Sequence, residues 1–300
     1  MKEEVSKFTC DGGGGGCENP GAGGQDAKTY SEKMADFVSD LNFVDIPGDV
    51  VEKSKQLVLD TLGVALAAVD ETFTKSILDV AKSMAGPGES SVWGSSVKLP
   101  AANAALVNGT MAHGLDFDDM HRAASSHMSV VVVPTALAVS EQKKVSGRKI
   151  IAAIVAGYEI GARIGLAALG KLLLRGWHPT AVFGTFSAAT VAAKLMGLTP
   201  RQTALAMGIA GSQASGLAQW IEEGSWTKRM HPGWAAHSGI IASLLARTGY
   251  DAPRKIFEGG QGLYRAFLRD GNYSLEKLTD QLGKRWETRQ ICIKMYPAGY

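Results

Sequence analysis

Residues 112–127 read AHGLDFDDMHRAASSH, and long apolar segments flank this polar stretch on both sides. Its carboxylates and imidazoles are Asp116, Asp118, Asp119, His113, His121 and His127. All six histidines of the chain lie between residues 113 and 237, so the side chains best suited to proton transfer near neutral pH are concentrated in one part of the sequence. If residues 114–121 form a loop between buried helices, these groups converge on a site for general acid–base chemistry.

The alternative is a solvated turn in which Asp118 and Asp119 cap the segment that follows. Two adjacent carboxylates cannot both point into one pocket without strong mutual repulsion, so at least one is expected to cap a helix or to orient a neighbour. Asp116 is therefore the carboxylate that we expect in the pocket.

A metal centre is a second interpretation of the same stretch. His113, Asp116, Asp119 and His121 have the ligand types of a metal-dependent histidine and aspartate phosphohydrolase, a class of helical enzymes. The three histidines further along the chain have no adjacent carboxylate, so a second His-Asp pair is missing. The sequence therefore favours a site without a metal.

A second polar stretch, WTKRMHPGWAAHSG at residues 226–239, holds Lys228, Arg229 and His231. We expect these side chains to precede a helix that begins near Pro232, because a helix N-terminus favours an anion. Two cations beside such a terminus would form a cradle for a carboxylate or a phosphate, and the alternative is an ordinary solvated patch. In the turn GWHPT at residues 176–180, His178 is a further candidate for substrate contact.

The apolar periodicity predicts a mainly α-helical fold. The first helix is expected from Tyr30, and the second is expected to begin with a capping box of Asp49 and Glu52. The buried face of that second helix is expected to hold Leu59, Leu62, Leu66 and Val69. Later segments are rich in Ala and Gly on more than one face, which is typical of helices that pack closely against other helices. They are Val130–Gln142, Lys149–Leu169, Ala181–Met196, Thr199–Leu217 and Trp234–Thr248.

Both ends of the chain differ from this helical pattern. Residues 1–28 are rich in glycine and cannot bury enough apolar surface to fold, so we expect a disordered tail. Residues 290–296, QICIKMY, alternate as a strand does, and a single strand needs partners. We therefore expect a helical domain over residues 29–273 and the incomplete beginning of a smaller α+β domain over residues 274–300.

The bulk composition excludes several classes of protein. With 31 basic and 29 acidic residues, no overall field favours nucleic acid or an acidic membrane surface. The apolar runs are too short or too charged for a membrane span, and the three cysteines form no disulfide framework. We expect a soluble cytoplasmic protein, with mitochondria as the alternative compartment.

Five segments, taken in order, resemble the MmgE/PrpD family over about residues 30–300. They are NGTMAHGLDFDDMH, SSHMSVVVVPTALA, GWHPTAVFGT, TKRMHPGWAAHSG and CIKMYP. The resemblance implies a helical domain with a smaller α+β lid, a homodimer, and lyase or isomerase chemistry on polycarboxylates without a metal or an organic cofactor. The chain departs from the family pattern at Met120, often Thr, and at Met128, usually Pro.

Carried over by position, the resemblance implies catalytic roles for Asp116, His121, His127 and Lys228. It implies that Lys294 belongs to the lid, and that His178 matches the family's His-Pro turn. With Arg229 and His231 from the second polar stretch, these two residues form the expected substrate-binding set.

This set of residues suits proton removal next to a carboxylate, because nearby cations stabilise the charge that develops. We expect a lyase that dehydrates a 2-methylcitrate-like acid, with a cis-aconitate-type decarboxylase or an iminodisuccinate-type epimerase as alternatives. Outside this chemistry, the alternatives are the metal-dependent phosphohydrolase and a helical dimer without catalytic activity.

Overall fold

The computed structural model describes residues 27–84, 86–269 and 271–298. The tail expected over residues 1–28 lies almost entirely outside the described residues, as do Cys10 and Cys17. The principal helices are α1 (Tyr30–Asp40), α2 (Gly48–Ala67), α3 (Thr72–Ser83), α4 (Ala101–His113), α5 (Ser129–Lys143), α6 (Gly147–Ala167), α7 (Pro179–Leu195), α8 (Pro200–Gln213) and α10 (Thr227–Arg247). Shorter elements are α9 (Trp220–Glu223), α11 (Leu263–Leu268) and four 3-10 turns, at Phe43–Asp45, Leu173–Arg175, Leu275–Leu278 and Glu287–Gln290. The mainly α-helical prediction is confirmed.

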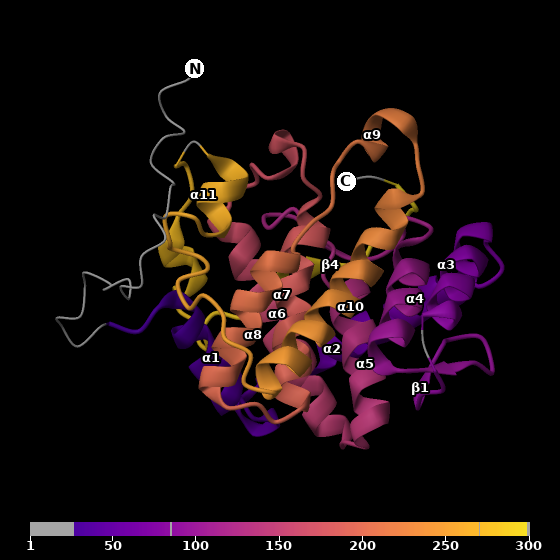
Figure 1. The fold of residues 1–300 in the computed structure, drawn as a ribbon, viewed down its shortest axis with the longest axis horizontal. Coiled ribbons are helices and arrows are strands. Elements are labelled where there is room, and N and C mark those ends of the chain that lie inside the picture. The colour runs from indigo at the N-terminus through magenta and orange to yellow at the C-terminus, as the bar shows by residue number, and fades with distance from the viewer. Residues whose placement is uncertain (1–26, 85, 270, 299–300) are drawn as a thin grey trace, which may run out of the picture.

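Helix α7 forms the centre of the bundle and packs against α5, α6, α8 and α10 (Figure 1). Helix α10 also crosses α4, which is buried along its whole length. The two helices approach closely where Gly109 of α4 faces Gly233 of α10. A Cβ added at Gly233 would lie 2.1 Å from the carbonyl oxygen of Leu106. The small residues of these segments therefore allow the close helix packing expected from the sequence.

Helix α6 is long and apolar enough, by composition alone, to cross a membrane. However, 83% of its most apolar 18-residue stretch is buried inside the fold, where the helix packs on α7 and α5. In this structure α6 is a core helix, consistent with the charges of Glu159 and Arg163 that it carries.

Two expectations about α2 are wrong. The helix begins after Pro47 without a side-chain cap, and the Asp49 carboxylate binds the guanidinium of Arg289 at 2.7 Å and 3.0 Å instead. Its buried face is also different, because Leu59 is 73% exposed and Leu66 is 51% exposed.

The face of α2 that is buried includes two small polar residues, Ser54 and Thr61. Their hydroxyls donate to the carbonyl oxygens of Val50 and Leu57, at 2.8 Å and 2.7 Å. Since each hydroxyl finds an acceptor within its own helix, it can be buried without losing a hydrogen bond. The count of leucines along α2 therefore indicated the wrong face.

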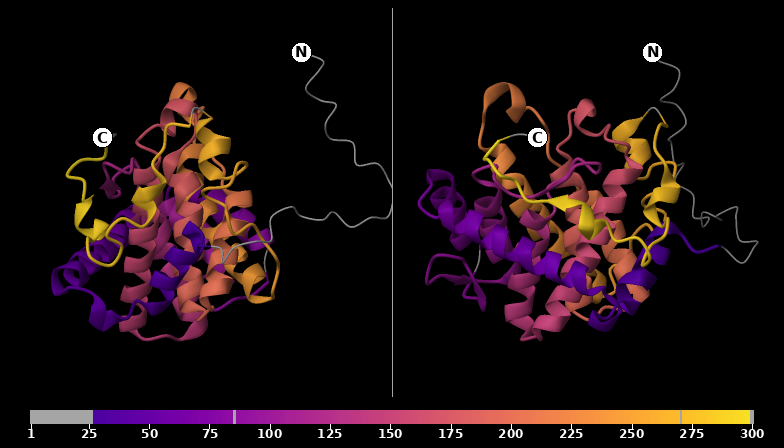
Figure 2. Two further views of the ribbon diagram at one scale, coloured as in Figure 1. Left: turned by 90° about the vertical axis from the view of Figure 1, so that its left-hand side faces the viewer. Right: turned by 180° about the vertical axis from the view of Figure 1, so that it is seen from behind.

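The described strands form two short antiparallel pairs. Strand β1 (Ser90–Ser91) pairs with β2 (Lys98–Leu99), and β3 (Met120–His121) pairs with β4 (Ile291–Cys292). The strand expected over residues 290–296 is thus reduced to two residues, and its partner lies in the polar stretch between α4 and α5. Residues 275–290 run along α6 on the side of the bundle that faces away from the viewer in Figure 1, as the view from behind shows (Figure 2, right). A domain boundary near residue 274 stays a prediction.

Candidate active site

The acidic turn after α4 meets the beginning of α10 and the segment after β4. Asp116 has a φ of 53°, in the left-handed region that a short polar residue tolerates. Its carboxylate accepts from Lys228 Nζ at 2.9 Å and from Lys294 Nζ at 3.0 Å, and its carbonyl oxygen accepts from Lys294 at 2.8 Å. One carboxylate is thus held between two lysines that lie far along the chain from it.

The two lysines keep this carboxylate charged. Partial burial would raise the pKa of Asp116, but the hydrogen bonds and charges of Lys228 and Lys294 outweigh it and lower the pKa. The Lys228 ammonium also lies 4.8 Å from the ring centre of Trp220, in a cation–π contact. No role was expected of Trp220 from the sequence, because a single tryptophan carries no motif.

Behind this turn, Asp118 binds two imidazoles at once. Its Oδ2 lies 2.9 Å from His113 Nδ1 and 2.9 Å from His127 Nδ1. The Asp119 carbonyl oxygen also lies 2.9 Å from His127 Nδ1. Because both partners of His127 Nδ1 are acceptors, Nδ1 carries a hydrogen and Nε2 is left for proton exchange. Asp118 is therefore an orienting group, one of the two roles expected for this pair of carboxylates.

The charges in this buried group are unequal. Burial would raise the pKa of Asp118, but the two imidazoles hold it well below its usual range. Burial lowers the pKa of His113, whereas at His127 the charge and hydrogen bond of Asp118 overcome burial and raise the pKa. The Asp118 carboxylate thus favours a proton on His127, while burial disfavours one on His113.

Asp119 has the other expected role, as a cap. Its carboxyl accepts the backbone N–H of Ser129 at the start of α5, at 3.1 Å, and also binds the Ser129 hydroxyl, which in turn contacts Tyr158. No cation contacts this carboxyl in the described part of the chain. Burial accordingly raises the pKa of Asp119 to about 7, in spite of the hydrogen bonds from Ser129.

His178 and His231 form a second imidazole pair, with their Nδ1 atoms 3.0 Å apart. Burial lowers the pKa of His178 well below its usual value and that of His231 to about 4, with the neighbouring imidazoles adding to the effect. The His178 ring stacks on His113, with the ring centres 5.6 Å apart. Four of the six histidines therefore lie together in one buried group, with both residues of this pair uncharged at neutral pH.

The second polar stretch begins its helix earlier than expected. Helix α10 starts at Thr227, and Pro232 lies inside it, so Lys228 and Arg229 occupy the first turn. Pro232 is the sixth residue of this helix and has no N–H, so the Lys228 carbonyl oxygen cannot accept the usual bond from the residue four positions later. Arg229 Nε donates to the Gly114 carbonyl oxygen at 2.8 Å. The cations still lie at a helix N-terminus, as expected.

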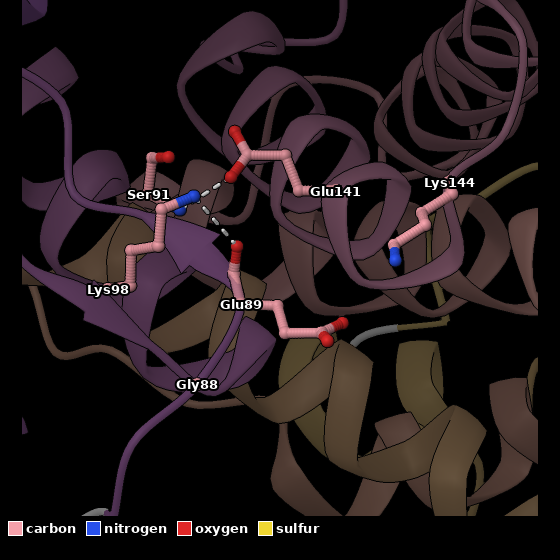
Figure 3. A pocket seen from close by; sticks show the side chains of 6 residues that line it. All are labelled: Gly88, Glu89, Ser91, Lys98, Glu141 and Lys144. Atoms are coloured by element: carbon pink, nitrogen blue, oxygen red, sulfur yellow. Dashed lines mark hydrogen bonds between the residues drawn. The ribbon is translucent and has the colours of Figure 1, made fainter.

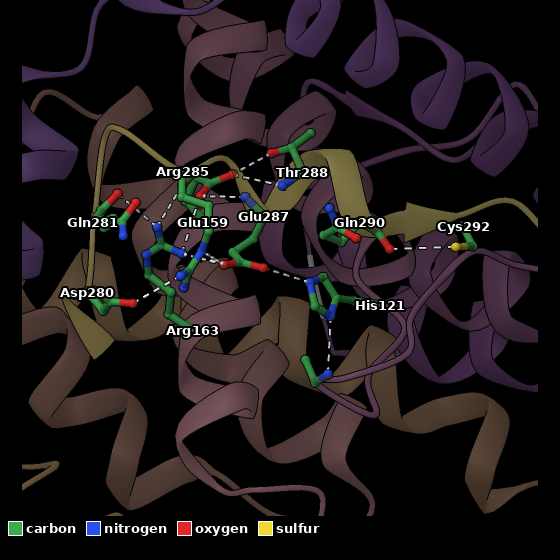
Figure 4. Close-up of polar contacts among 11 residues, drawn as sticks. His121, Glu159, Arg163, Asp280, Gln281, Arg285, Glu287, Thr288, Gln290 and Cys292 are labelled. Carbon is green, nitrogen blue, oxygen red and sulfur yellow. Dashed lines mark hydrogen bonds and ion pairs between the residues drawn. The ribbon is translucent and has the colours of Figure 1, made fainter. Parts of the chain in front are cut away.

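His121 does not join the other site residues. Its Nε2 lies 3.2 Å from a Glu287 carboxylate oxygen, and its Nδ1 accepts the backbone N–H of Ala124 at 3.1 Å (Figure 4). Both ring nitrogens are bound by the chain, and the residue is buried. The catalytic role expected of His121 does not fit this placement, because the motif gave its spacing but not the direction of its side chain.

A pocket opens where these elements meet. Its lining residues are His113, Gly114, Leu115, Asp116, Trp220, Ile221, Gly224, Ser225, Lys228 and Arg229. Lys294 and His127 lie behind this lining, against Asp116 and His113, and 11% of the His127 side chain is exposed. The hollow thus has the cations of Lys228 and Arg229 and the imidazole of His113 in its lining, with His127 directly behind His113.

The donor atoms of His113, Asp116, Asp118 and His127 lie within 4.8 Å of one another, so these residues are close enough to hold a metal ion. Asp116 is already bound by two lysines, whose charges oppose a further cation. The set expected for a phosphohydrolase centre is not gathered, since Asp119 and His121 point to other partners.

A separate hollow lies at β1 and the end of α5 (Figure 3). There Glu141 accepts the Ser91 N–H at 2.7 Å, and Lys98 donates to the Glu89 carbonyl oxygen at 3.4 Å. It contains no histidine, and its charged groups serve to hold the hairpin to α5, so we assign it no catalytic role.

The fold and site define a helical domain with a lysine-bound aspartate beside a buried histidine group. The model of the MmgE/PrpD N-terminal domain matches residues 32–276, and the chain belongs to the MmgE/PrpD family. It is 35% identical to a cis-aconitate decarboxylase-like protein of Aspergillus oryzae, over 88% of this chain and 57% of that protein. It is 35% identical to a cis-aconitate decarboxylase of Aspergillus terreus, over 89% of this chain and 56% of the relative. It is 30% identical to the human cis-aconitate decarboxylase, over 90% of this chain and 57% of that protein. The chain thus spans little more than half the length of these relatives.

Proposed function

We propose that this domain carries the site of a lyase for small polycarboxylates, and that the favoured reaction is decarboxylation of a cis-aconitate-like acid. The observation that carries the proposal is the Asp116 carboxylate held by Lys228 and Lys294, beside a His127 ring that Asp118 fixes. The names of the relatives favour decarboxylation over the dehydration that we expected first.

The cations have hydrogen-bond donors left for a substrate. An ammonium has three N–H donors, of which Lys228 uses one and Lys294 uses two in contacts with Asp116. Arg229 adds a guanidinium at the same helix terminus, with Nε alone bound to the Gly114 carbonyl. These groups suit two carboxylates of one substrate, since a bidentate guanidinium and two ammonium groups match that charge.

His127 supplies the proton. When carbon dioxide leaves, the electron pair of the broken C–C bond stays on the substrate and spreads towards a carboxylate held by the lysines. A proton must then reach carbon, and His127 can donate it from Nε2 because Asp118 holds Nδ1 and favours the imidazolium. Dehydration would begin with proton removal, for which a neutral imidazole is needed. An imidazolium could still protonate the leaving hydroxyl, so the choice of decarboxylation rests on the names of the relatives.

Three further elements of the proposal concern the whole protein. We propose a homodimer, a lid domain that continues from residues 274–300, and a soluble protein in the cytoplasm, following the family resemblance. Because the chain spans little more than half the length of its relatives, the lid domain has to be tested by experiment. Sedimentation of the purified protein tests the dimer, and a monomer at micromolar concentration would reject it.

The reaction is tested by mixing the purified chain with cis-aconitate, 2-methylcitrate and citrate, and following carbon dioxide release and water loss separately. We expect carbon dioxide from cis-aconitate and no turnover by His127→Ala. Water loss from 2-methylcitrate alone would replace decarboxylation by dehydration. Absence of turnover and of binding for all three acids would leave the helical dimer without catalytic activity as the better description.

A further inference from the structure

A buried polar clasp holds the segment that carries Lys294. We define the clasp as Glu159 and Arg163 of α6, Glu287 of the last 3-10 turn, and His121 of β3 (Figure 4). All four residues are buried, and together they join α6, the chain leading to β4, and the polar stretch after α4. In the described part of the chain, the hydrogen bonds and ion pairs of these four residues go to residues outside the pocket lining.

Side chains of α6 form hydrogen bonds directly with the backbone of residues 285–288. The Glu159 carboxylate accepts the N–H of Glu287 at 3.0 Å, and the N–H and the hydroxyl of Thr288 at 2.9 Å and 2.8 Å. The Arg163 guanidinium donates to the Arg285 carbonyl oxygen at 2.8 Å and lies 3.3 Å from the Glu287 carboxylate. These contacts fix the position of residues 285–288.

His121 then joins this segment to the acidic turn. Its Nε2 binds Glu287, and its backbone pairs with Ile291 in the β3–β4 ladder. Three residues after Ile291, Lys294 is only 2% exposed at its side chain and donates twice to Asp116. Asp116 and His121 are only five residues apart. The segment from Glu287 to Lys294 therefore contacts this stretch twice, through Glu287 at His121 and through Lys294 at Asp116.

We propose that the clasp positions Lys294 against Asp116, and that His121 and Glu287 are positioning residues that act through this lysine. The role of Lys294 in the reaction rests on the proposed function, whereas its placement by the clasp can be tested without turnover. A short segment with only two ladder residues has little other means of holding a charged side chain in one place.

The first test measures the access of reagents to lysine. The purified chain is treated with a limiting amine-acylating reagent, and the modified lysines are quantified by peptide mass spectrometry. In His121→Asn and in Glu287→Gln, we expect Lys294 to react about tenfold faster, the size of effect that the loss of one hydrogen bond to a charged group produces. Lys194, whose Nζ donates to the Val38 carbonyl oxygen, is the internal reference and should be unchanged.

A matched control is Tyr264→Phe, which removes a buried hydrogen bond to the Ile164 carbonyl oxygen on the same helix α6 but does not touch the clasp. We expect its Lys294 to stay protected. Protection of Lys294 in both clasp variants would overturn the proposal. So would an equal rise at Lys294 and Lys194 in both variants, because it would show that the clasp supports the whole fold and not this lysine.

The second test separates this inference from the proposed function. If His121 acts through Lys294, then His121→Asn should lower kcat/KM in the natural chain but cause no further loss in the Lys294→Ala variant. If the two residues act independently, the losses in kcat/KM from the two substitutions should multiply. Full activity of Lys294→Ala would reject its role in the reaction and leave the labelling result standing. A loss in Lys294→Ala with additive effects of His121→Asn would reject the clasp alone.

Discussion

At the scale of single residues, Asp118 determines what the histidines can do. It is buried, it accepts from His113 and His127 through one oxygen, and its charge favours a proton on His127. The same carboxylate leaves His113 neutral, since burial there outweighs it. The pKa values of two imidazoles that share one carboxylate are thus shifted in opposite directions.

The first prediction concerns the pH dependence of turnover. With His127 as proton donor, activity should fall as pH rises through its pKa. Asp118→Asn removes the charge that raises this pKa, while burial, Lys294 and Lys228 still oppose protonation. The fall should therefore begin about one pH unit lower, as measured by kcat/KM from pH 5 to pH 9. Asp119→Asn is the matched control, and an unshifted profile in Asp118→Asn would contradict the assignment of His127 as acid.

The second prediction concerns Lys228. Replacing it by Ala removes one of the two cations that bind Asp116, and should lower kcat/KM by roughly 100-fold, the usual effect of losing one preorganised charge at a reacting group. Melting of the variant should change little, because Lys228 is partly exposed. Lys75→Ala on α3, far along the chain, serves as control. Equal activity of the two variants would remove Lys228 from the site.

The third prediction concerns the stability contributed by Asp119. Its pKa in the folded chain is about 7, above the ordinary value, so the folded state binds the proton more tightly than the unfolded state does. Stability from this group is present below about pH 4 and is lost as pH rises through 7. Asp119→Asn imitates the protonated carboxyl, and should melt several degrees above the natural chain at pH 8 and close to it only below about pH 4. Equal melting temperatures at both pH values would contradict this.

At the scale of elements, the approach of α10 to α4 decides where the cations lie. Gly233 lies against the backbone of α4, and Lys228 is one and a half turns earlier on the same helix. The two helices can pack this closely only if no Cβ stands between them. The spacing between the acidic turn and Lys228 is therefore set by a glycine outside the pocket.

The fourth prediction follows from this contact. In Gly233→Ala the new Cβ would meet the Leu106 carbonyl oxygen, so α10 must shift, at a cost of about 1–3 kcal/mol in the free energy of unfolding. Gly63→Ala on α2 is the matched control, since nothing lies within 4 Å of its added Cβ and Ala is the better helix former. Urea unfolding of both variants measures the difference. Equal stability of the two would show that α10 adjusts without strain.

At the scale of the whole molecule, the site is assembled from three separate parts of the chain. Asp116 comes from the turn after α4, Lys228 from the first turn of α10, and Lys294 from the segment after β4. A polycarboxylate that binds these cations should stabilise the folded state over the unfolded chain, in which the three parts are dispersed.

The fifth prediction is that cis-aconitate raises the melting temperature of the chain by several degrees, since a ligand at 100 times its Kd contributes about 2.7 kcal/mol. Acetate at equal ionic strength is the control ligand, and Lys228→Ala the control protein. Scanning calorimetry measures the shift. A shift of equal size with acetate would indicate a general salt effect and not a site for polycarboxylates.

The sequence by itself determined the helical class and the turns in which the polar residues lie. The reason is local: apolar periodicity and helix caps depend on neighbours in the chain, as in the capping box of Thr199 and Gln202 that begins α8. The motifs also indicated Asp116, Lys228 and Lys294, which the structure brings together.

Only the tertiary structure decided which way the side chains face. His121 and His127 are six residues apart in one polar stretch, yet His127 lies beside the site and His121 binds Glu287, from the other end of the chain. The buried face of α2 and the charge state of Asp119 were settled in the same way, by what packs against them. Direction, burial and pKa depend on contacts between segments distant in sequence, and local patterns do not contain that information.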